Sequence, residues 1–167
     1  PFMFSAMNEE MERRGRNITG VDFCFSGAAP LTENVKRNFE IRTGARIFEG
    51  YGLSEASPVT HANPPNETAR TGMIGVPLPG TRARIVSEDD ASIEMPPGGV
   101  GELLVKGPQV MQGYLTRQDE TAAILRDGWL HTGDMASMDS DGFFRIVDRK
   151  KDMIITGGLN VFPTEVE

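Results

Sequence analysis

The chain carries, from residue 48 to residue 58, the stretch Phe48-Glu49-Gly50-Tyr51-Gly52-Leu53-Ser54-Glu55-Ala56-Ser57-Pro58. It follows the short run at residues 45–48, which predicts a buried strand. The glycines let a ligand approach the main chain, and Tyr51 between them offers a flat face to a planar ring. Ser54 can donate to a phosphate oxygen, and Glu55 is an oxygen ligand that Mg²⁺ accepts beside a phosphate. The stretch predicts a nucleotide site, against the alternative of a glycine-rich turn with Tyr51 packed and Glu55 solvated.

The acidic composition argues against one class of partner. The 167 residues have a net charge of -7 and a pI of about 4.9, whereas a surface that binds nucleic acid non-specifically is basic. The single cysteine, Cys24, cannot form an internal disulfide and is expected to be a small buried residue. No run reaches the length of a membrane span and no signal peptide is visible, so the cytoplasm is the expected location.

The first third of the chain predicts a βαβ unit after an amphipathic helix. Residues 2–14 place methionines at helical spacing before a glycine, which predicts a helix with a methionine-rich core face. Residues 21–25 predict a strand, residues 31–43 a helix ended by Gly44, and residues 45–48 the next strand. Two strands joined in this way are parallel, and ligands bind beyond their carboxyl ends. We therefore expect the loops at residues 26–30 and 50–55 to lie side by side.

The rest of the chain predicts an antiparallel region. Short strand-like runs at residues 82–87, 101–106 and 143–147 are separated by turn clusters, with one short helix at residues 119–125. Asp139-Ser140-Asp141-Gly142 lacks the remaining ligands of a calcium loop, so it predicts a hairpin turn. Two distant histidines and one cysteine make no zinc site, and neither a Gly-x-Ser-x-Gly elbow nor a Walker-type loop is present.

Five ordered motifs between residues 26 and 165 resemble one superfamily. The first two are Ser26-Gly27-Ala28-Ala29-Pro30 and the stretch at residues 50–55; Trp129-Leu130-His131-Thr132-Gly133-Asp134 lies between two longer motifs at residues 101–114 and 142–165. In this order they resemble the adenylate-forming superfamily of acyl-CoA synthetases, luciferases and peptide-synthetase adenylation domains. The amino-acid sequence at residues 106–111 and 148–154 is most similar to that of bacterial or archaeal fatty-acid–CoA ligases.

The resemblance implies a role for each matching residue. Tyr51 would stack on adenine, Asp134 would accept both ribose hydroxyls, and Arg149 would bind the ribose side. Glu55 would hold Mg²⁺, and Lys151 would be the hinge between a large and a small domain. The implied catalytic residues are Ser54, Glu55 and Lys151. The implied nucleotide and CoA contacts are Gly27, Ala28, Ala29, Pro30, Glu49, Gly50, Tyr51, Gly52, Ser54, Asp134, Ile146, Arg149, Gly157 and Gly158.

The implied fold is mixed α/β: a βαβ portion of a parallel sheet, then an antiparallel, barrel-like β-rich subdomain, then the first hairpin of a small C-terminal domain. The expected boundaries are residues 1–60, 61–149 and 150–167. The chain begins at Pro1 and stops at Glu167 in mid-pattern, and the family's phosphate loop and adenylation lysine are not found in it. We therefore expect an inactive piece of a longer enzyme.

The implied substrates are a fatty acid, ATP (leaving as AMP) and coenzyme A, with Mg²⁺ as the metal and no nucleic acid. A peripheral membrane contact and a homodimer of the parent protein stay open. Two alternatives also stay open: an aryl-acid CoA ligase or another adenylate-forming enzyme, and a non-catalytic nucleotide-binding relative. Acyl chain length cannot be read from these residues.

Overall fold

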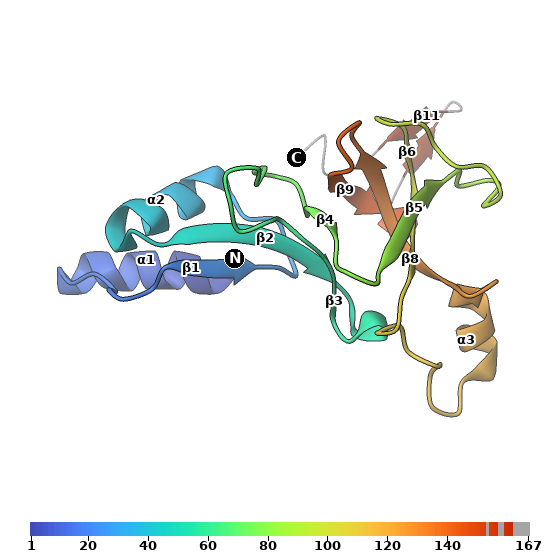
Figure 1. The fold of residues 1–167 in the computed structure, drawn as a ribbon, viewed down its shortest axis with the longest axis horizontal. Helices are drawn as coiled ribbons and strands as arrows, with labels where there is room; N and C mark the ends of the chain where they lie inside the picture. Colours follow the sequence, from blue (N-terminus) through green and yellow to red (C-terminus); the bar gives the residue numbers. More distant parts are fainter. Residues whose placement is uncertain (153, 157–158, 162–167) are drawn as a thin grey trace.

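The computed structural model describes residues 1–152, 154–156 and 159–161. Figure 1 shows a helical region at one end and a strand-rich region at the other, connected through β2 and β3. The helices are α1 (Phe2–Arg14), α2 (Glu33–Thr43) and α3 (Gln118–Ile124), with short 3₁₀ turns at η1 (Ser54–Ala56) and η2 (Lys150–Asp152). The strands are β1 (Phe23–Ser26), β2 (Arg46–Gly52), β3 (Val59–Ala62), β4 (Val76–Pro77), β5 (Arg82–Val86), β6 (Val100–Lys106), β7 (Leu125–Arg126), β8 (Trp129–Met138), β9 (Phe144–Arg149), β10 (Ile154–Thr156) and β11 (Leu159–Val161).

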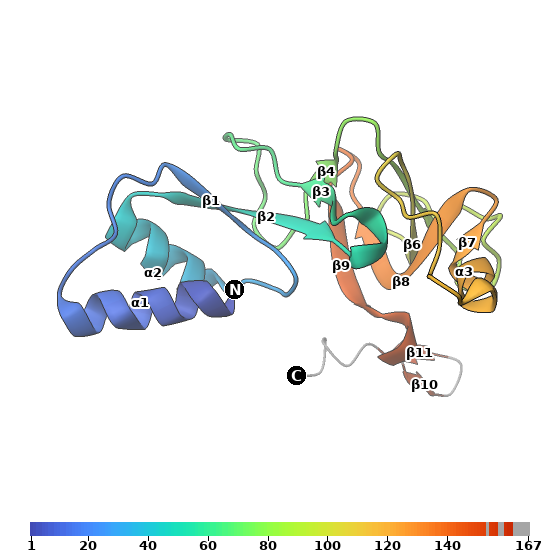
Figure 2. The ribbon, with the colours of Figure 1, turned by 90° about the horizontal axis from the view of Figure 1, so that it is seen from below.

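The predicted βαβ unit is confirmed. β1 and β2 pair in parallel, and the helices α1 and α2 lie on one side of them (Figure 2). The core between helices and strands is apolar, and the Phe4 and Phe39 rings meet edge to face at 5.0 Å. Glycines cap both helices in the left-handed conformation. The methionine face is only partly as predicted, because Met11 is buried whereas Met3 is 72% exposed.

The two regions are joined by backbone pairing. β2, β3 and β4 pair antiparallel, and β5, β6, β8 and β7 form a second antiparallel sheet with β9 beside β8. The segment before β4 pairs with β9, where the Ile74 N–H donates to the Phe144 carbonyl and the Phe144 N–H donates to the Gly75 carbonyl, both at 2.8 Å. This link curls the strands into the expected barrel-like form.

Gly75 is required at this link for two reasons. Its φ is +90°, in the region that glycine tolerates best, and a Cβ there would lie 2.1 Å from the backbone of Ala62. Two neighbouring chain segments can therefore approach only because residue 75 has no side chain.

Several strands differ from the sequence-based expectation: the short strands β3, β4 and β7 were not predicted, and two further differences, at β2 and β8, affect the site. β2 continues to Gly52, so Glu49, Gly50 and Gly52 lie in the strand rather than in a loop after it. Neither glycine has a positive φ; a Cβ on Gly52 would lie 1.8 Å from the Pro58 carbonyl oxygen, so the tight turn into β3 explains that residue. β8 was not predicted as a strand at all, although it pairs with β6, β7 and β9.

Three further expectations agree with the structure, whereas Cys24, expected to be buried, is only partly buried. The turn at residues 139–142 is a hairpin turn, in which Asp139 Oδ1 accepts from the N–H groups of Asp141 and Phe143. The short helix is α3, and β10 pairs antiparallel with β11 as the expected terminal hairpin. Among the helices that the structure describes, none has both the length and the apolar character needed to cross a bilayer.

Candidate nucleotide site

Asp134 is placed by an irregularity in β8. Glu102 of β6 is opposite Met135 and Leu104 is opposite His131, so Leu103 alone faces residues 132–134. Such an excess of residues on one strand is a bulge, and Gly133 in it has a φ of 71°. The Thr132 hydroxyl donates to the Leu103 carbonyl at 2.8 Å and accepts from the Asp134 N–H at 3.1 Å. The bulge therefore re-aims Asp134 while its backbone groups stay paired.

Tyr51, Asp134 and Arg149 meet, as the resemblance implies. The Tyr51 hydroxyl donates to Asp134 Oδ2, and the Arg149 Nε lies 2.8 Å from Asp134 Oδ1. Asp134 and Arg149 are cross-strand partners on β8 and β9, whereas Tyr51 comes from β2, 83 residues away from Asp134. The Asp134 side chain is 4% exposed and that of Arg149 is 59% exposed. The carboxylate is thus buried, whereas the arginine that pairs with it reaches solvent.

Burial sets the protonation of this group. It raises the pKa of Asp134, while the hydrogen bond from Tyr51 and the charge of Arg149 act in the opposite direction. Burial and the neighbouring carboxylate hold the pKa of Tyr51 well above its usual value, so its hydroxyl stays protonated and donates. Asp134 therefore accepts from a protonated Tyr51 and from Arg149 at a largely buried position of the sheet.

The loop at residues 26–30 lies beside β2, which confirms the expected proximity. Ser26 pairs with Glu49, and a Cβ on Gly27 would lie 3.2 Å from the Gly50 carbonyl oxygen. Ala28 has a φ of 71°, and the four loop residues after Ser26 are exposed. A planar ring could lie against this backbone edge, because no long side chain covers it.

Ser54 and Glu55 lie in η1, directly after β2. Ser54 is exposed, and Glu55 Oε1 accepts from the Tyr114 hydroxyl at 2.6 Å. The Met111 N–H donates to the Glu55 carbonyl at 2.8 Å, so the turn is fixed to the segment after β6. Within the described part of the chain, no group of three or more His, Cys, Asp or Glu residues could hold a metal ion. Glu55 can therefore serve only as one ligand of a metal whose other ligands come from elsewhere.

The other predicted residues have mixed positions. Glu49 Oε1 accepts from the Gly72 N–H at 2.9 Å, which ties β2 to the loop before β4. Ile146 packs against the core under the antiparallel sheet. Lys151 is exposed in η2, close after the Asp134–Arg149 pair in the chain. Gly157 and Gly158 lie outside the described residues.

Three buried or half-buried side chains near the site were not predicted. Glu102 lies under the bulge, Lys150 pairs with it at 3.1 Å, and His61 of β3 packs its ring 4.7 Å from that of Phe144. Glu102 lies in the motif at residues 101–114 and Lys150 in the motif at residues 142–165, so these motifs were the signal that could have pointed to both residues. Nothing in the sequence marks His61, because a single histidine between Thr60 and Ala62 belongs to no motif.

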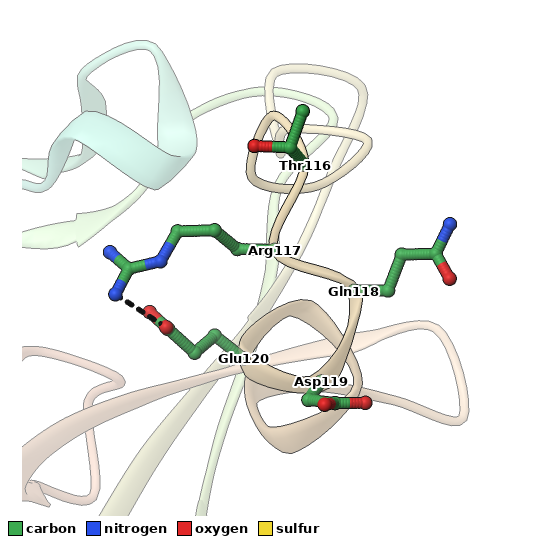
Figure 3. Close-up of a pocket in the computed structure, with 5 residues that line it drawn as sticks. All are labelled: Thr116, Arg117, Gln118, Asp119 and Glu120. Carbon is green, nitrogen blue, oxygen red and sulfur yellow. Dashed lines mark ion pairs between the residues drawn. The ribbon is translucent and has the colours of Figure 1, made fainter.

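A separate depression lies at the start of α3, lined by residues 116–120 (Figure 3). Arg117 pairs there with Glu120 at 2.6 Å. None of the predicted site residues lines it, so it is not part of the Asp134 site.

Comparison with known proteins gives relatives that are similar over the whole chain. A long-chain-fatty-acid–CoA ligase of Bacillus subtilis (strain 168) is 50% identical over 167 residues, which cover 100% of this chain and 30% of that protein. The chain thus spans about a third of the length of this relative.

Solved structures are also similar to this chain over most of its length. ATP-bound MatB from Rhodopseudomonas palustris has a TM-score of 0.78 and 38% identity, over 86% of this chain and 28% of that one. The anthranilate CoA ligase AuaEII, in complex with anthranoyl-AMP, has a TM-score of 0.86 and 25% identity, over 98% of this chain and 31% of that one. The family described as AMP-binding enzyme matches residues 1–115, more than half of the sequence. The chain belongs to the AMP-binding enzyme family.

Proposed function

We propose that the protein carrying this chain activates a fatty acid with ATP and transfers the acyl group to coenzyme A. The observation that carries the proposal is the meeting of Tyr51, Asp134 and Arg149 from three different strands. The Bacillus subtilis relative, named for a fatty acid and CoA, supports these substrates. The solved relatives with bound ATP and anthranoyl-AMP support the nucleotide.

Asp134 keeps acceptor capacity for a ribose. An ionised carboxylate offers about four lone-pair positions, and Tyr51 and Arg149 occupy one on each oxygen. The remaining positions accept the two ribose hydroxyls. The Tyr51 ring and the backbone edge at residues 27–30 then lie against adenine, and Arg149 adds positive charge on the solvent side.

Glu55 fits Mg²⁺ as a single protein ligand. Magnesium is commonly bound by one or two carboxylates together with substrate phosphates and waters, so one glutamate suffices if the triphosphate supplies the rest. The Tyr114 hydroxyl orients Glu55 by donating to one of its oxygens. A bound Mg²⁺ would neutralise phosphate charge, and Ser54 in the same turn is placed to donate to a phosphate oxygen.

The proposed reaction has two steps. A carboxylate oxygen of the fatty acid attacks the α-phosphorus of ATP, and the bond to pyrophosphate breaks, giving the acyl-adenylate. The thiolate of coenzyme A then attacks the acyl carbon, and AMP leaves with the electron pair of the acyl–oxygen bond. Residues 1–60 and 61–149 belong in this scheme to a large domain, and residues 150–167 begin a small domain that turns about Lys151 between the steps.

Asp134→Asn in the full-length protein tests the nucleotide site. The amide keeps the shape but loses charge and acceptor capacity, so we expect AMP affinity to fall by roughly 30-fold or more, the worth of one or two charge-assisted hydrogen bonds. Asp119→Asn, on exposed α3, is the matched control and should bind AMP normally. Titration calorimetry measures both; unchanged affinity of the Asp134 variant would refute the site.

A panel of acids tests the substrate. AMP release by the full-length protein is measured with CoA and acetate, medium-chain, long-chain or aromatic acids, and the long-chain acid should be the best substrate. The structural likeness to an anthranilate CoA ligase is the reason to include aromatic acids, which are the second candidate. Residues 1–167 alone should show no pyrophosphate exchange above background, because they span only 30% of the length of the ligase they match.

A further inference from the structure

Glu102 lies beneath the bulge that places Asp134. The residue is 6% exposed, and its Oε1 accepts from the Gly133 N–H at 3.3 Å. Gly133 directly precedes Asp134, so this hydrogen bond holds the backbone at the point where β8 departs from regular pairing. A buried carboxylate is costly unless it is paired and hydrogen-bonded, so its partners matter.

The second oxygen of Glu102 reaches the other side of the site. Lys150 Nζ lies 3.1 Å from Oε2, and Lys150 directly follows Arg149. Glu102 therefore binds the residue before Asp134 and the residue after Arg149, although it comes from a third strand, β6. His131 Nδ1 is 3.6 Å from the same oxygen, beyond a normal hydrogen bond, and burial lowers the pKa of this histidine.

The charge on Glu102 needs an explanation beyond the bulge. The Gly133 N–H requires only an acceptor, and the neutral amide of a glutamine would supply one. A negative charge this close to Asp134 also disfavours ionisation of the buried aspartate. Lys150 is the contact that needs the charge, since only an ionised carboxylate pairs with an ammonium group.

We propose that Glu102 is a positioning residue: it holds Asp134 and Arg149 in register for the ribose and ties that pair, through Lys150, to the segment containing Lys151. The proposal rests on the function proposed above. In this arrangement three strands form the ribose site, and β6 supports it without contacting the nucleotide itself. It also links the site to the position at which the small domain is expected to turn.

Glu102→Gln and Lys150→Met, alone and together, test this coupling in the full-length protein. Glutamine keeps an acceptor for Gly133 but releases Lys150, so we expect the Kd for AMP to rise roughly tenfold, the worth of one charge-assisted hydrogen bond. Lys150→Met should weaken binding at least as much. The double variant should bind within about twofold of Glu102→Gln, because residues acting through one contact are not additive. The KM for ATP should rise while the KM for the fatty acid stays unchanged.

Two controls separate positioning from loss of stability. Glu94→Gln removes an exposed glutamate that pairs with Arg84 at 3.6 Å beyond the other edge of β6, and AMP affinity should stay unchanged. Phe39→Leu weakens the helical core and lowers the melting temperature without touching the site, so its AMP affinity should also be normal. Equal weakening in Phe39→Leu and Glu102→Gln would overturn the proposal.

Hydrogen exchange gives a readout that needs no nucleotide. Segments 131–135 and 147–150 should exchange faster in Glu102→Gln and Lys150→Met than in the wild type, and Glu94→Gln should match the wild type. Unchanged exchange in these segments, or strictly additive losses of AMP affinity, would overturn the role of Glu102. If the wild type did not bind AMP but exchange was faster in Glu102→Gln and Lys150→Met, the proposed function would be refuted. The conclusion that Glu102 positions both strands would then still be supported.

Discussion

The helical region (residues 2–48) and the antiparallel region (residues 50–149) are stabilised in different ways. The core between the helices and β1–β2 is an apolar cluster that includes Phe4, Phe39 and Ile47. The antiparallel region buries an apolar cluster as well, but beside it lie fully or nearly buried polar residues: Thr60, His61, Asn63, Glu102, His131, Thr132 and Asp134. The helical region buries one polar side chain, Ser26, among its apolar residues, whereas the antiparallel region buries seven.

The difference separates what folding requires from what the site requires. Apolar side chains stabilise when buried, by about 25 cal/mol per Å² of apolar surface. A buried polar group contributes about 0.5–1.5 kcal/mol when it is hydrogen-bonded and costs about 1–3 kcal/mol when it has no partner. Three of these polar residues, Glu102, His131 and Thr132, lie at or beneath the bulge that carries Asp134, which is where we propose that ribose binds. The stability of this region is therefore more sensitive to pH and to small changes in backbone position than that of the helical region.

Gly75→Ala should have the largest effect, because it acts within the antiparallel region, where the segment before β4 packs against Ala62 of β3 and pairs with Phe144 of β9. An alanine there combines a φ of +90° with a Cβ 2.1 Å from the Ala62 backbone. Left-handed strain and overlap each cost about 1–3 kcal/mol, so we expect the free energy of unfolding to fall by about 3 kcal/mol or more. Urea unfolding of the full-length protein measures the loss.

Gly142→Ala is the matched control for that change. Its φ of +83° is similar, but nothing lies within 4 Å of the added Cβ. It therefore carries only the conformational strain, about 1–2 kcal/mol. Equal losses in the two variants would mean that the close approach of Gly75 to Ala62 contributes nothing to the stability of the antiparallel region.

Acid should weaken the antiparallel region before the helical one. His61 is fully buried, its Nε2 has no partner, and burial lowers its pKa to about 3. An unfolded histidine has a pKa near 6.5, so below that pH the unfolded chain takes up a proton that the folded chain refuses. Stability contributed by the neutral histidine is complete above about pH 6.5 and falls as the pH drops, by about 2 kcal/mol at pH 5.

The comparison of His61→Gln with the wild type isolates the contribution of His61 to the pH dependence of stability. The variant loses stability at every pH, but its stability should change less between pH 7 and pH 5, because one titrating group is gone. Nuclear magnetic resonance of the wild type should also show the His61 ring neutral at pH 5. A His61 that titrates near 6.5 in the folded protein would contradict the expectation. Both histidines lie in the antiparallel region, so hydrogen exchange at pH 5 should rise in β3 and β8 but not in β1.

The helical region was predictable because its pattern is local. Leu31, Val35 and Phe39 repeat at helical spacing before Gly44, and apolar runs flank that helix on both sides. Each of these signals depends on residues close in sequence. The hairpin turn at residues 139–142 was predictable for the same reason, since Asp139 binds backbone groups just after it.

β8 escaped prediction because its site residues break the pattern. Its buried positions include His131, Thr132 and Asp134, which read as loop residues, and Gly133 adds a bulge. A strand buried on both faces also lacks the alternation that marks a half-exposed strand. The residues at the proposed site are therefore the ones that prevented β8 from being recognised as a strand in the sequence.

The convergence on Asp134 could not follow from periodicity either. Tyr51 and Asp134 are 83 residues apart, and nothing local connects them. The resemblance to adenylate-forming enzymes brought them together as motifs, but it did not include the Glu102 contacts, because a buried acceptor under a bulge becomes visible only in three dimensions. Sequence reasoning proposed Tyr51, Asp134 and Arg149, which meet in the structure, and missed the Glu102 contacts beneath them.

Arg70→Lys should have the smallest effect of these changes, although Arg70 makes many contacts. Its guanidinium pairs with Asp139 and, at 2.6 Å, with Asp141, and it lies 4.2 Å from the centre of the Phe143 ring. Lysine keeps the charge but loses the planar fork and the stacking. Because the side chain is 38% exposed, water and salt screen the pairs, so we expect a smaller loss of stability than for Gly75→Ala or for acid. The loss should shrink further as salt is raised from 0.1 M to about 1 M, where the screening length is near 3 Å. A loss that ignored salt would instead assign the contribution to stacking on Phe143, and would place a packing contact, not a charge pair, at the link between the loop before β4 and the β8–β9 turn.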